Sequence, residues 1–478
     1  MSAAESVLAP ASMARRAFLA WSVFAAIAVA LAAVAVARWV WAVTLDGPIL
    51  YGEGAVAHAA ILARDRLEYT VGARYGDVAP LFTAANYPPL YFHLVGLGDP
   101  FVIGRALSAA ATGAVAAAIG WHARGGGRLV ALALATGWLA SFPVAVWGPA
   151  VKPDLVALAL TTGGVLALSS RSGWEGSLVG GALLGLAVTA KPTAGLPALA
   201  LAAALVLRGD ALGLLRYGAA GIGAAFAAGL VTRLPDKAMY LHVIDWNALA
   251  WSPEQAVLLG FVAVFTIGVP VLFALVLRAP RGPFAAYLVG AAAIAILGGR
   301  EGATINYLLD LATASALALA AIASRLRAGV VLPLAAAAQL LVAVVLLDPF
   351  GLVPGRASST GAWGDPSRLA VVRGLPSAPA LVEDSGLLVA SGREPLVDDL
   401  FLWSRLLDRG GSFREGEVVL AAVRDGRVAM IVSETELERI DAAPAYERQR
   451  WSARLVRAVL DGYRIDRRDG SLWVYVRR

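Results

Sequence analysis

Residues 17–43 read A-F-L-A-W-S-V-F-A-A-I-A-V-A-L-A-A-V-A-V-A-R-W-V-W-A-V, an apolar run of 27 residues that follows Arg15 and Arg16. A helix of about 20 apolar residues can cross the hydrocarbon core of a bilayer, whereas the core of a signal peptide has only about 7–15. We therefore expect an uncleaved transmembrane helix here. Ten shorter apolar blocks follow, at residues 101–121, 128–147, 153–169, 176–190, 192–207, 212–231, 255–277, 283–298, 302–323 and 329–347. The sequence predicts a polytopic α-helical membrane protein with about eleven transmembrane helices.

The composition of the whole chain agrees with this class. Of its 478 residues, 59% are hydrophobic and 15% are charged, against roughly 45–50% and about 25% in soluble domains. This balance excludes a cytosolic enzyme and a disordered chain. The absence of Cys excludes a disulfide-stabilised secreted module, a thiolate nucleophile and a Cys-ligated metal. The formal net charge of +6 is explained by Arg on one side of a membrane, so we predict no nucleic-acid partner.

The basic residues predict the orientation of the chain. Short cytoplasmic loops are enriched in Lys and Arg. With Arg15 and Arg16 on the inner side, the alternate short connections also carry basic residues, at Arg124, Arg128, Arg171, Arg208, Arg216, Arg278, Arg281, Arg325 and Arg327. The excess of Arg over Lys, with abundant Ala and Gly, is typical of a high-GC bacterial genome. We expect a multi-pass protein of the bacterial inner (plasma) membrane, with a cytoplasmic N-terminus and an extracytoplasmic C-terminal domain.

Two connections on the predicted outer side are long, at residues 44–100 and 232–254. Within the first, residues 55–66 (A-V-A-H-A-A-I-L-A-R-D-R) are apolar on one helical face, which is typical of a helix at the membrane interface. The second connection is rich in Trp and Tyr, which favour the same depth. We expect interfacial helices in both outer loops.

The character of the sequence changes after Asp348 and Pro349. Residues 351–478 hold most of the acidic residues, and short apolar runs alternate there with helical stretches. The apolar runs are 380–382, 386–391, 428–433 and 472–476, and the helical stretches are 400–408, 418–424 and 451–460. This alternation predicts a small α/β domain, and no P-loop or G-x-G-x-x-G indicates a nucleotide site. We divide the chain into a transmembrane domain, residues 1–350, and an extracytoplasmic α/β domain, residues 351–478.

Polar residues that a transmembrane pattern does not require gather on the predicted outer side. Ionisable groups in or near a bilayer are costly and mark functional sites by default. The group includes every Lys of the chain and consists of Asp46, Glu53, Tyr87, His93, Arg105, Lys152, Asp154, Lys191, Lys237, Arg300, Glu301, Asn306 and Asp310. Carboxylates and cations beneath two interfacial segments suit chemistry on a charged lipid headgroup.

Six short motifs of this region resemble a known family in their order and spacing. They are Y-G-E-G-A-V-A-H-A-A-I-L-A-R at 51–64, N-Y-P-P-L-Y-F-H-L at 86–94, G-R-A-L-S at 104–108, V-K-P-D-L at 151–155, T-A-K-P-T at 189–193 and R-E-G-A-T-I-N-Y-L-L-D at 300–310. Residues 15–350, and more loosely the C-terminal region, resemble the bacterial GT-C integral-membrane glycosyltransferases. The likeness is to the family 39-like group, related to protein O-mannosyltransferases and the lipid A aminoarabinose transferase. It implies transfer of a sugar, with inversion, from a polyprenyl-phosphate donor to an acceptor outside the membrane.

Glu53 is the predicted catalytic base. The resemblance implies an acidic pair in the first outer loop, for which this sequence offers Glu53 and, seven residues earlier, Asp46. An inverting displacement needs a base on the face of the sugar opposite the leaving group. Gly52 and Gly54 flank Glu53 and allow a close approach of the backbone. The structural alternative is that Glu53 caps the adjacent helix and interacts with its dipole.

Lys191 is the predicted phosphate binder. It stands between two apolar blocks with almost no loop to hold it, so its ammonium group has to reach the interface. There it could neutralise the charge that develops on a leaving lipid phosphate. The structural alternative is a Lys side chain that extends to the interface from a helix end.

Seven further residues are predicted to bind the donor phosphate or the substrate: Lys152, Asp154, Arg105, Arg300, Glu301, Tyr87 and Asn306. Each also has a structural alternative. Pro153 with Asp154 can simply mark the start of a helix, and Tyr87 precedes a Pro pair that stiffens the backbone. No cofactor is indicated beyond a weakly favoured divalent metal, for which Glu53, His58 and His93 are candidate ligands.

Two other classes of function stay open at this point. A secondary transporter would place its charges near the bilayer midplane and often has repeated halves, whereas here the charges gather on one face and no repeat is apparent. A non-catalytic envelope-assembly protein is the other alternative. The expected partners are membrane lipid, a polyprenyl-phosphate sugar donor and an extracytoplasmic protein, lipid or glycan acceptor. The transferase requires Glu53, Lys152, Lys191 and Glu301 to converge around one outer cavity.

Overall fold

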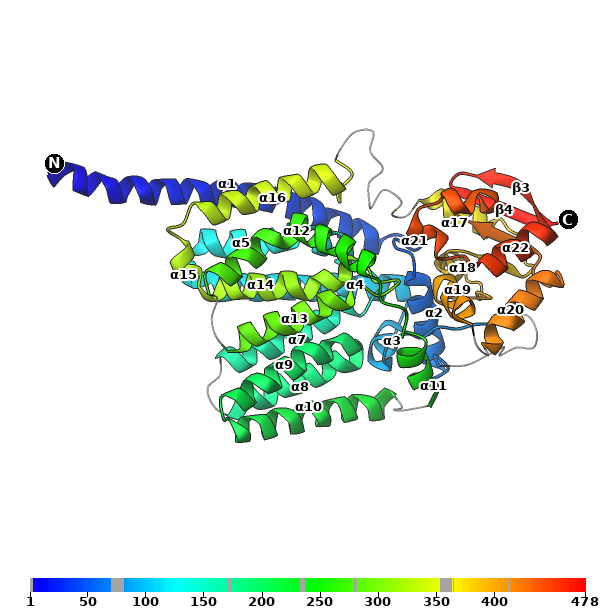
Figure 1. Ribbon diagram of the computed structural model, residues 1–478, viewed down its shortest axis with the longest axis horizontal. Coiled ribbons are helices and arrows are strands. Elements are labelled where there is room, and N and C mark those ends of the chain that lie inside the picture. The colour runs from blue at the N-terminus through cyan, green and yellow to red at the C-terminus, as the bar shows by residue number, and fades with distance from the viewer. Residues whose placement is uncertain are drawn as a thin grey trace.

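A computed structural model describes residues 3–69, 81–170, 174–232, 237–278, 282–352, 363, 365–410 and 413–478. Arg171, Arg281, and residues 70–80 and 233–236 of the two outer loops lie outside the described residues. A bundle of long helices makes up the first part of the chain, and a smaller α/β domain lies at one end of it (Figure 1). The N-terminus lies at the opposite end of the molecule.

Apolar helices form the bundle. Among the described residues, four are long and apolar enough to cross a membrane: α1 (Ala3–Val43), α4 (Pro100–Ala123), α10 (Ala211–Thr232) and α12 (Pro253–Val276). Seven shorter ones pack with them: α5 (Arg128–Ala140), α7 (Asp154–Ser170), α8 (Trp174–Ala190), α9 (Gly195–Leu207), α13 (Pro283–Leu297), α14 (Leu309–Ala321) and α16 (Val331–Leu347). These eleven helices match the predicted apolar blocks, and the polytopic fold class is confirmed.

One predicted block is broken into two helices. The block at 128–147 forms α5 and then the short α6 (Phe142–Trp147), with Ser141 extended between them. Pro143 lies in the first turn of α6. Proline has no N–H and clashes with the preceding turn, so it is tolerated at a helix start but not within one. Trp147, the last residue of α6, lines a cavity together with Asp399 and Phe401 of the C-terminal domain.

The outer loops contain short helices that connect the two domains. They are α2 (Glu53–Arg64), α3 (Pro89–Val95), α11 (Lys237–Tyr240) and the π-helical turn η3 (Leu241–Asp245). The predicted helix at residues 55–66 corresponds to α2, and ten of the twelve residues of α2 are buried in protein. A Cβ added to Gly54 would lie 2.1 Å from the backbone nitrogen of Gly386. This close approach places α2 directly against the C-terminal domain.

Short helical elements complete the bundle and its connections. They are α15 (Ala323–Leu326) and the 3-10 turns η1 (Arg124–Gly126), η2 (Pro192–Ala194) and η4 (Ile305–Leu308). The turns η2 and η4 immediately precede α9 and α14 on the side of the C-terminal domain, whereas η1 and α15 contact each other at the opposite end. Lys191 and Arg300 therefore lie at helix ends rather than within helices.

The C-terminal domain is a small mixed sheet covered by helices. The described strands are β1 (Ala380–Val382), β2 (Met430–Ser433), β3 (Tyr463–Asp469) and β4 (Leu472–Arg477), in the order β1-β2-β4-β3. β1 pairs with β2 in parallel, with Leu381 opposite Ile431, and the other pairs are antiparallel. The helices are α17 (Pro366–Arg373), α18 (Ser385–Ala390), α19 (Leu400–Arg409), α20 (Arg414–Arg424), η5 (Leu437–Ala442), α21 (Ala445–Arg448) and α22 (Ala453–Gly462).

The α/β class of this domain is as predicted, but two of its elements differ. The apolar run at 386–391 belongs to a helix, α18, and not to a strand. The reason is the cap that precedes it, because the side chain of Asp384 accepts a hydrogen bond from the backbone N–H of Gly386. Residues 463–469 form β3, an edge strand whose exposed, Arg-rich sequence carries no apolar signal.

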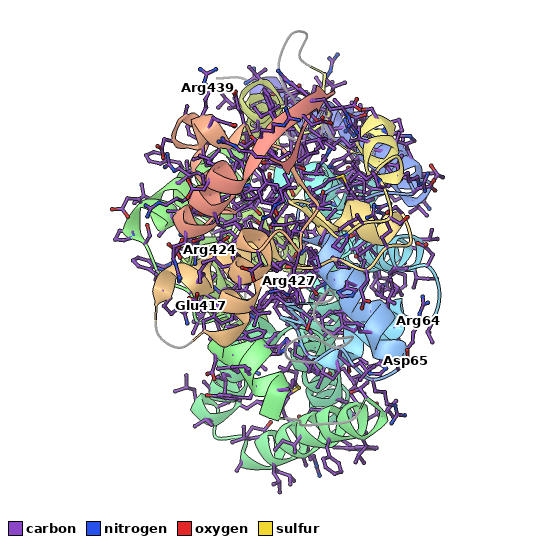
Figure 2. All side chains as sticks on the ribbon, turned by 90° about the vertical axis from the view of Figure 1, so that its right-hand side faces the viewer. Arg64, Asp65, Glu417, Arg424, Arg427 and Arg439 are labelled. Atoms are coloured by element: carbon purple, nitrogen blue, oxygen red, sulfur yellow. The ribbon has the colours of Figure 1, made fainter. Side chains whose placement is uncertain are left out.

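The outer surface of the C-terminal domain is polar. Figure 2 looks onto this end of the molecule, and its labelled charged side chains are spread from the edge of the face (Arg439, Arg64, Asp65) to its middle (Arg427). Glu417, Arg424, Arg427 and Arg439 belong to the C-terminal domain, and Arg64 and Asp65 end α2. By contrast, many large apolar side chains of the bundle helices, such as Phe226 and Phe261, are exposed. An apolar belt below a polar cap is the surface of a protein embedded in lipid.

Helices α8 and α10 pack through small residues. Gly181 and Gly185 are one turn apart on α8, and a Cβ on either would lie 2.1 Å from a backbone oxygen of α10, that of Tyr217 or Gly221. The G-x-x-x-G spacing lets two membrane helices approach closely.

We expect Gly185→Leu to lower the stability of the folded protein by about 1–3 kcal/mol, because the added side chain must push α10 away. The matched control is Gly223→Leu on α10, where the residue is exposed and nothing lies within 4 Å of an added Cβ. Thermal unfolding in detergent measures both. Equal unfolding temperatures for the two variants would show that this contact does not hold the helices together.

Candidate functional site

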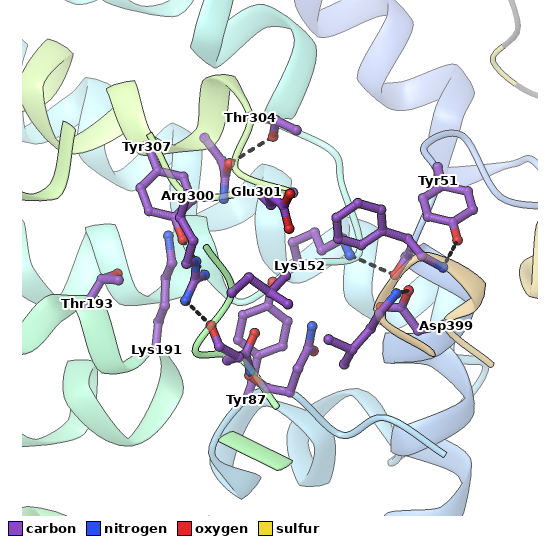
Figure 3. A pocket seen from close by; sticks show the side chains of 18 of the residues that line it. Tyr51, Tyr87, Lys152, Lys191, Thr193, Arg300, Glu301, Thr304, Tyr307 and Asp399 are labelled. Atoms are coloured by element: carbon purple, nitrogen blue, oxygen red, sulfur yellow. Dashed lines mark hydrogen bonds between the residues drawn. The ribbon is translucent and has the colours of Figure 1, made fainter. Parts of the chain in front are cut away.

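A cavity lies where the bundle meets the C-terminal domain, and Figure 3 shows it from close by. Its volume is about 170 Å³, and a cavity of ~150 Å³ holds one six-membered ring. Three kinds of side chain line it: cations (Lys152, Lys191, Arg300), carboxylates (Glu301, Asp399), and aromatic or amide groups (Tyr51, Asn86, Tyr87, Trp147, Asn247, Asn306, Tyr307, Phe401, Tyr446). This mixture is suited to a polar, anionic ligand with a ring.

Lys191 is held by an ion pair at one side of the cavity. Its Nζ lies 2.6 Å from Oδ1 of Asp154, in the first turn of α7. Nδ2 of Asn306 donates to the same oxygen at 2.8 Å, and the hydroxyl of Thr304 donates to Oδ1 of Asn306 at 2.8 Å. Two segments that are distant in sequence, at Asp154 and at residues 304–306, therefore position the Lys191 ammonium group. Lys191 also lines the cavity.

Arg300 is positioned by neutral groups only. Its Nη1 donates to the backbone carbonyl of Asn247 at 2.7 Å, and its Nη2 donates to the hydroxyl of Tyr307 at 2.7 Å. The Lys191 ammonium group lies 5.4 Å from the ring centre of the same Tyr307. Within the described part of the chain, Arg300 has no carboxylate within ion-pair distance. Its guanidinium charge is oriented but not neutralised.

Lys152 has a similar environment. Only 9% of its surface is exposed, and its Nζ donates to the backbone carbonyl of Gly52 at 2.7 Å. Gly52 has φ +80°, a conformation that favours glycine, and a Cβ there would lie 2.9 Å from the Lys152 ammonium nitrogen. In the described ranges, Lys152 also has no carboxylate within 4 Å. A second cation at the cavity is thus fixed by a carbonyl oxygen alone.

Two carboxylates reach the cavity, one from each domain. Glu301 follows Arg300, and its side chain forms no hydrogen bond or ion pair with any residue that the structure describes. Asp399 caps α19, where its Oδ1 accepts a hydrogen bond from the backbone N–H of Leu402 at 2.9 Å. Burial raises the pKa of Asp399 to about 6, against the lowering effects of the Leu402 hydrogen bond and of Lys152.

An aromatic and cationic stack holds the C-terminal domain over the cavity. The Arg450 guanidinium lies 4.0 Å from the ring centre of Tyr51 and 4.9 Å from that of Tyr446. Arg450 also forms ion pairs with Glu383 at 3.1 Å and Glu434 at 2.7 Å. The Tyr51 hydroxyl accepts a hydrogen bond from the backbone N–H of Phe401 at 2.9 Å. The wall that carries Asp399 is therefore fixed against the first outer loop.

Glu53, the predicted base, does not line the cavity. It is fully buried, and its Oε2 accepts from Arg105 at 3.1 Å and from the backbone N–H of Ile49 at 2.9 Å. Its Oε1 accepts from the backbone N–H of Val151 at 2.8 Å. Both oxygens are engaged and the side chain is fully buried, so neither oxygen faces the cavity in this structure. These surroundings favour a structural role for Glu53, at the start of α2 and in an ion pair with Arg105.

Arg105, one of the predicted donor-binding residues, is the ion-pair partner of Glu53. It is fully buried and does not line the cavity. Its Nη1 donates to the carbonyls of Ala42 and Leu45, and its Nη2 donates to that of Gly47. The ion pair therefore joins the end of α1, the first outer loop, α4 and the loop that carries Lys152.

Asp46 and the candidate metal ligands lie away from the cavity. The side chain of Asp46 is 72% exposed and faces Arg373 at 3.5 Å, so it cannot act with the cavity residues. His58 lies 3.0 Å from Asp398, and His93 lies 3.3 Å from Glu68. In the described part of the chain, no group of three or more His, Cys, Asp or Glu could hold a metal ion. Glu53, His58 and His93 do not form a common site.

The structure thus brings together Lys152, Lys191, Arg300, Glu301, Tyr87 and Asn306, with Asp154 directly behind Lys191. Sequence reasoning missed Asp399, Tyr51, Asn247 and Tyr446 as cavity residues. Asp399 had a local signal, since an Asp before the apolar stretch at 400–403 is a typical helix cap. No local signal could have shown that this cap faces Lys152 from another domain.

We expect Glu53→Gln to lower the free energy of unfolding by about 3–5 kcal/mol, because Arg105 would remain buried without a counter-charge. The control is Asp46→Asn, at an exposed carboxylate, which should stay within ~0.5 kcal/mol of the wild type. Denaturant unfolding in mixed micelles measures both variants. Wild-type stability in Glu53→Gln would mean that this ion pair is not the structural tie inferred here.

Among known proteins, the chain matches solved structures but no family model or curated sequence. ArnT from Cupriavidus metallidurans bound to undecaprenyl phosphate has a TM-score of 0.56 at 15% identity, over 94% of this chain and 97% of that chain. The apo form of the same protein has a TM-score of 0.52 at 14% identity, with the same coverage. The chain therefore shares the fold of ArnT along nearly its whole length, and the fold predicted from the sequence is confirmed.

Proposed function

We propose that this protein is a glycosyltransferase that moves a sugar, with inversion, from a polyprenyl-phosphate donor to an acceptor outside the membrane. The observation that carries the proposal is the pair of cavity cations, Lys152 and Arg300, that have no carboxylate partner among the described residues. A poorly solvated cation without a counter-charge is costly. A bound phosphate would supply that charge, and Lys191 adds a third cation beside it.

The surroundings of the cavity support a lipid-linked phosphate. The cavity lies at the ends of apolar helices, so a ligand could keep its chain in the bilayer while its headgroup occupies the polar space. ArnT, which shares this fold, has been crystallised with undecaprenyl phosphate. Because one fold can host unrelated functions, the proposal depends on the cations and not on the fold alone.

In the proposed reaction, an acceptor oxygen forms a bond to C1 of the sugar while the bond from C1 to the phosphate oxygen breaks. The electron pair leaves with the polyprenyl phosphate, and Lys152, Lys191 and Arg300 stabilise its charge. The acceptor proton passes to a carboxylate on the opposite face of the sugar. Both oxygens of Glu53 are occupied by Arg105 and backbone N–H groups, which supports assigning the base to a carboxylate that reaches the cavity.

We also infer that the cavity and the C-terminal domain face outward from a bacterial inner membrane. The arginine-bearing connections η1 and α15 lie at the other end of the bundle, as expected for cytoplasmic loops. A cavity at the helix ends also favours a transferase over a secondary transporter, whose sites lie near the midplane. A protein, a lipid or a glycan could serve as the acceptor.

We expect Lys152→Met and Arg300→Met each to raise the Kd for undecaprenyl phosphate by roughly 10–100-fold, because a hydrogen bond to a charged group contributes about 1.5–3 kcal/mol. The control is Arg327→Met, at an exposed residue near the opposite end of the bundle. Binding is measured with the purified full chain in nanodiscs. Wild-type Kd values in both cavity variants would show that the phosphate does not bind in this cavity.

Mass spectrometry of lipids that co-purify with the protein gives an independent test. We expect a polyprenyl phosphate or its glycoside to be retained by the wild type and depleted in the Lys152→Met and Arg300→Met variants. Retention of ordinary phospholipids alone, at equal levels in all variants, would contradict the proposal.

A further inference from the structure

The geometry points to Asp399, supplied by the C-terminal domain, as the general base that removes the proton from the acceptor hydroxyl. This inference rests on the proposed transfer reaction and names the catalytic residue that it leaves open. It also gives the C-terminal domain a direct part in the chemistry, in place of a purely supporting one.

Asp399 is anchored and yet directed at the cavity. The carboxylate is 9% exposed, lines the cavity and is fixed through the hydrogen bond from the Leu402 N–H to its Oδ1. Within the described residues it has no ion-pair partner within 4 Å and no hydrogen bond from a side chain. A general base needs both properties, because its carboxylate must be held in position and must still have an oxygen that can accept a proton.

The position of Asp399 suits an inverting displacement. In Figure 3, Lys191 and Arg300 lie on one side of the cavity and Asp399 lies on the other, with Lys152 between them. A phosphate bound between Arg300 and Lys152, with Lys191 beside it, would place the departing oxygen on the side of the sugar away from Asp399. Glu301 lies in the middle of this view, beside Lys152, and so nearer to Arg300 than Asp399 does. We therefore assign Asp399 to the face of the sugar opposite the leaving group.

The aromatic groups around Asp399 line the part of the cavity where the acceptor would bind. Tyr51 and Tyr446 meet edge to face with ring centres 6.3 Å apart, and Phe401 stacks on Tyr446 at the same centre distance. These rings lie beside the carboxylate on the C-terminal side of the cavity. An acceptor with an apolar face and a hydroxyl, such as a sugar ring, fits an aromatic wall next to a hydrogen-bond acceptor.

The protonation behaviour of Asp399 agrees with this role. Its pKa of about 6 results mainly from burial. The charged and titratable groups that face it are Lys152 from the loop before α7, Asp398 from its own segment, and Tyr51, Tyr87 and Tyr446 from the neighbouring walls. A base with this pKa is mostly ionised at pH 7 and still basic enough to accept a proton in the transition state.

The proposed transfer breaks two bonds and forms two. The acceptor O–H bond breaks as its oxygen bonds to C1 of the sugar, and the proton goes to the Asp399 carboxylate. The bond from C1 to the phosphate oxygen breaks at the same time, and the pair of electrons leaves with the polyprenyl phosphate. Protonated Asp399 then returns its proton to water before the next turnover.

The test compares Asp399→Asn with the wild type in proteoliposomes supplied with undecaprenyl-phosphate-linked monosaccharides and a membrane lipid extract as the acceptor source. Release of undecaprenyl phosphate is followed from pH 5 to 8. The wild-type rate should fall roughly tenfold from pH 7 to 5, as Asp399 becomes protonated. Asp399→Asn should be about 10²–10⁴-fold slower at pH 7 and should lose this acid limb. Its Kd for undecaprenyl phosphate should match the wild type.

Two further variants separate this role from a structural one. Asn is itself a good helix cap, so Asp399→Asn preserves the start of α19. Asp365→Asn alters another helix cap, at the start of α17 and outside the cavity, and should keep the wild-type rate and pH profile. Glu301→Gln should keep the acid limb near pH 6 whatever its rate.

The outcomes distinguish the two proposals. A wild type that releases undecaprenyl phosphate, with an Asp399→Asn variant of equal rate and pH profile, overturns the role of Asp399 alone. Loss of the acid limb in Glu301→Gln but not in Asp399→Asn assigns the base to Glu301. A wild type that neither binds undecaprenyl phosphate nor releases it overturns the proposed function and, with it, this inference.

Discussion

The buried ion pair between Glu53 and Arg105 is the interaction on which the geometry of the cavity depends. Taking two charges out of water is expensive, and the cost is offset only where the remaining donors and acceptors are also satisfied. Here the Glu53 oxygens accept from two backbone N–H groups as well, and Arg105 donates to three carbonyls. One of those N–H groups belongs to Val151, next to Lys152. The pair thereby fixes the loop that presents a cation to the cavity.

The cavity combines groups that satisfy one another with groups that do not. Asp154, Asn306 and Lys191 form a closed cluster, whereas Lys152 and Arg300 are oriented by carbonyl and hydroxyl oxygens. Neutral partners hold a cation in place without neutralising its charge, so the charge stays available to an anion. The same distinction separates Glu53, whose oxygens are fully used, from Glu301 and Asp399, which face the cavity.

The two domains share one site. Arg450 stacks on Tyr51 of the first outer loop, the Tyr51 hydroxyl accepts from Phe401, and Asp399 completes the wall. The fold likeness to ArnT spans both domains, since it covers 94% of this chain. The chemistry nevertheless has to be argued from side chains, because 15% identity carries the fold and not the roles of residues.

The eleven apolar helices, the α/β nature of the C-terminal region and the gathering of Lys152, Lys191, Arg300 and Glu301 on one side could all be predicted from the amino-acid sequence. These features depend on length, hydropathy and spacing, which are local. The folded structure was needed to show that α2 is buried, that Glu53 lies outside the cavity and that Asp399 lies inside it. Those outcomes depend on partners far away in the chain, such as Arg105 for Glu53 and Phe401 for Tyr51. A local pattern shows that a residue is ionisable, but its solvation and its hydrogen bonds are set by segments that meet only in the folded protein.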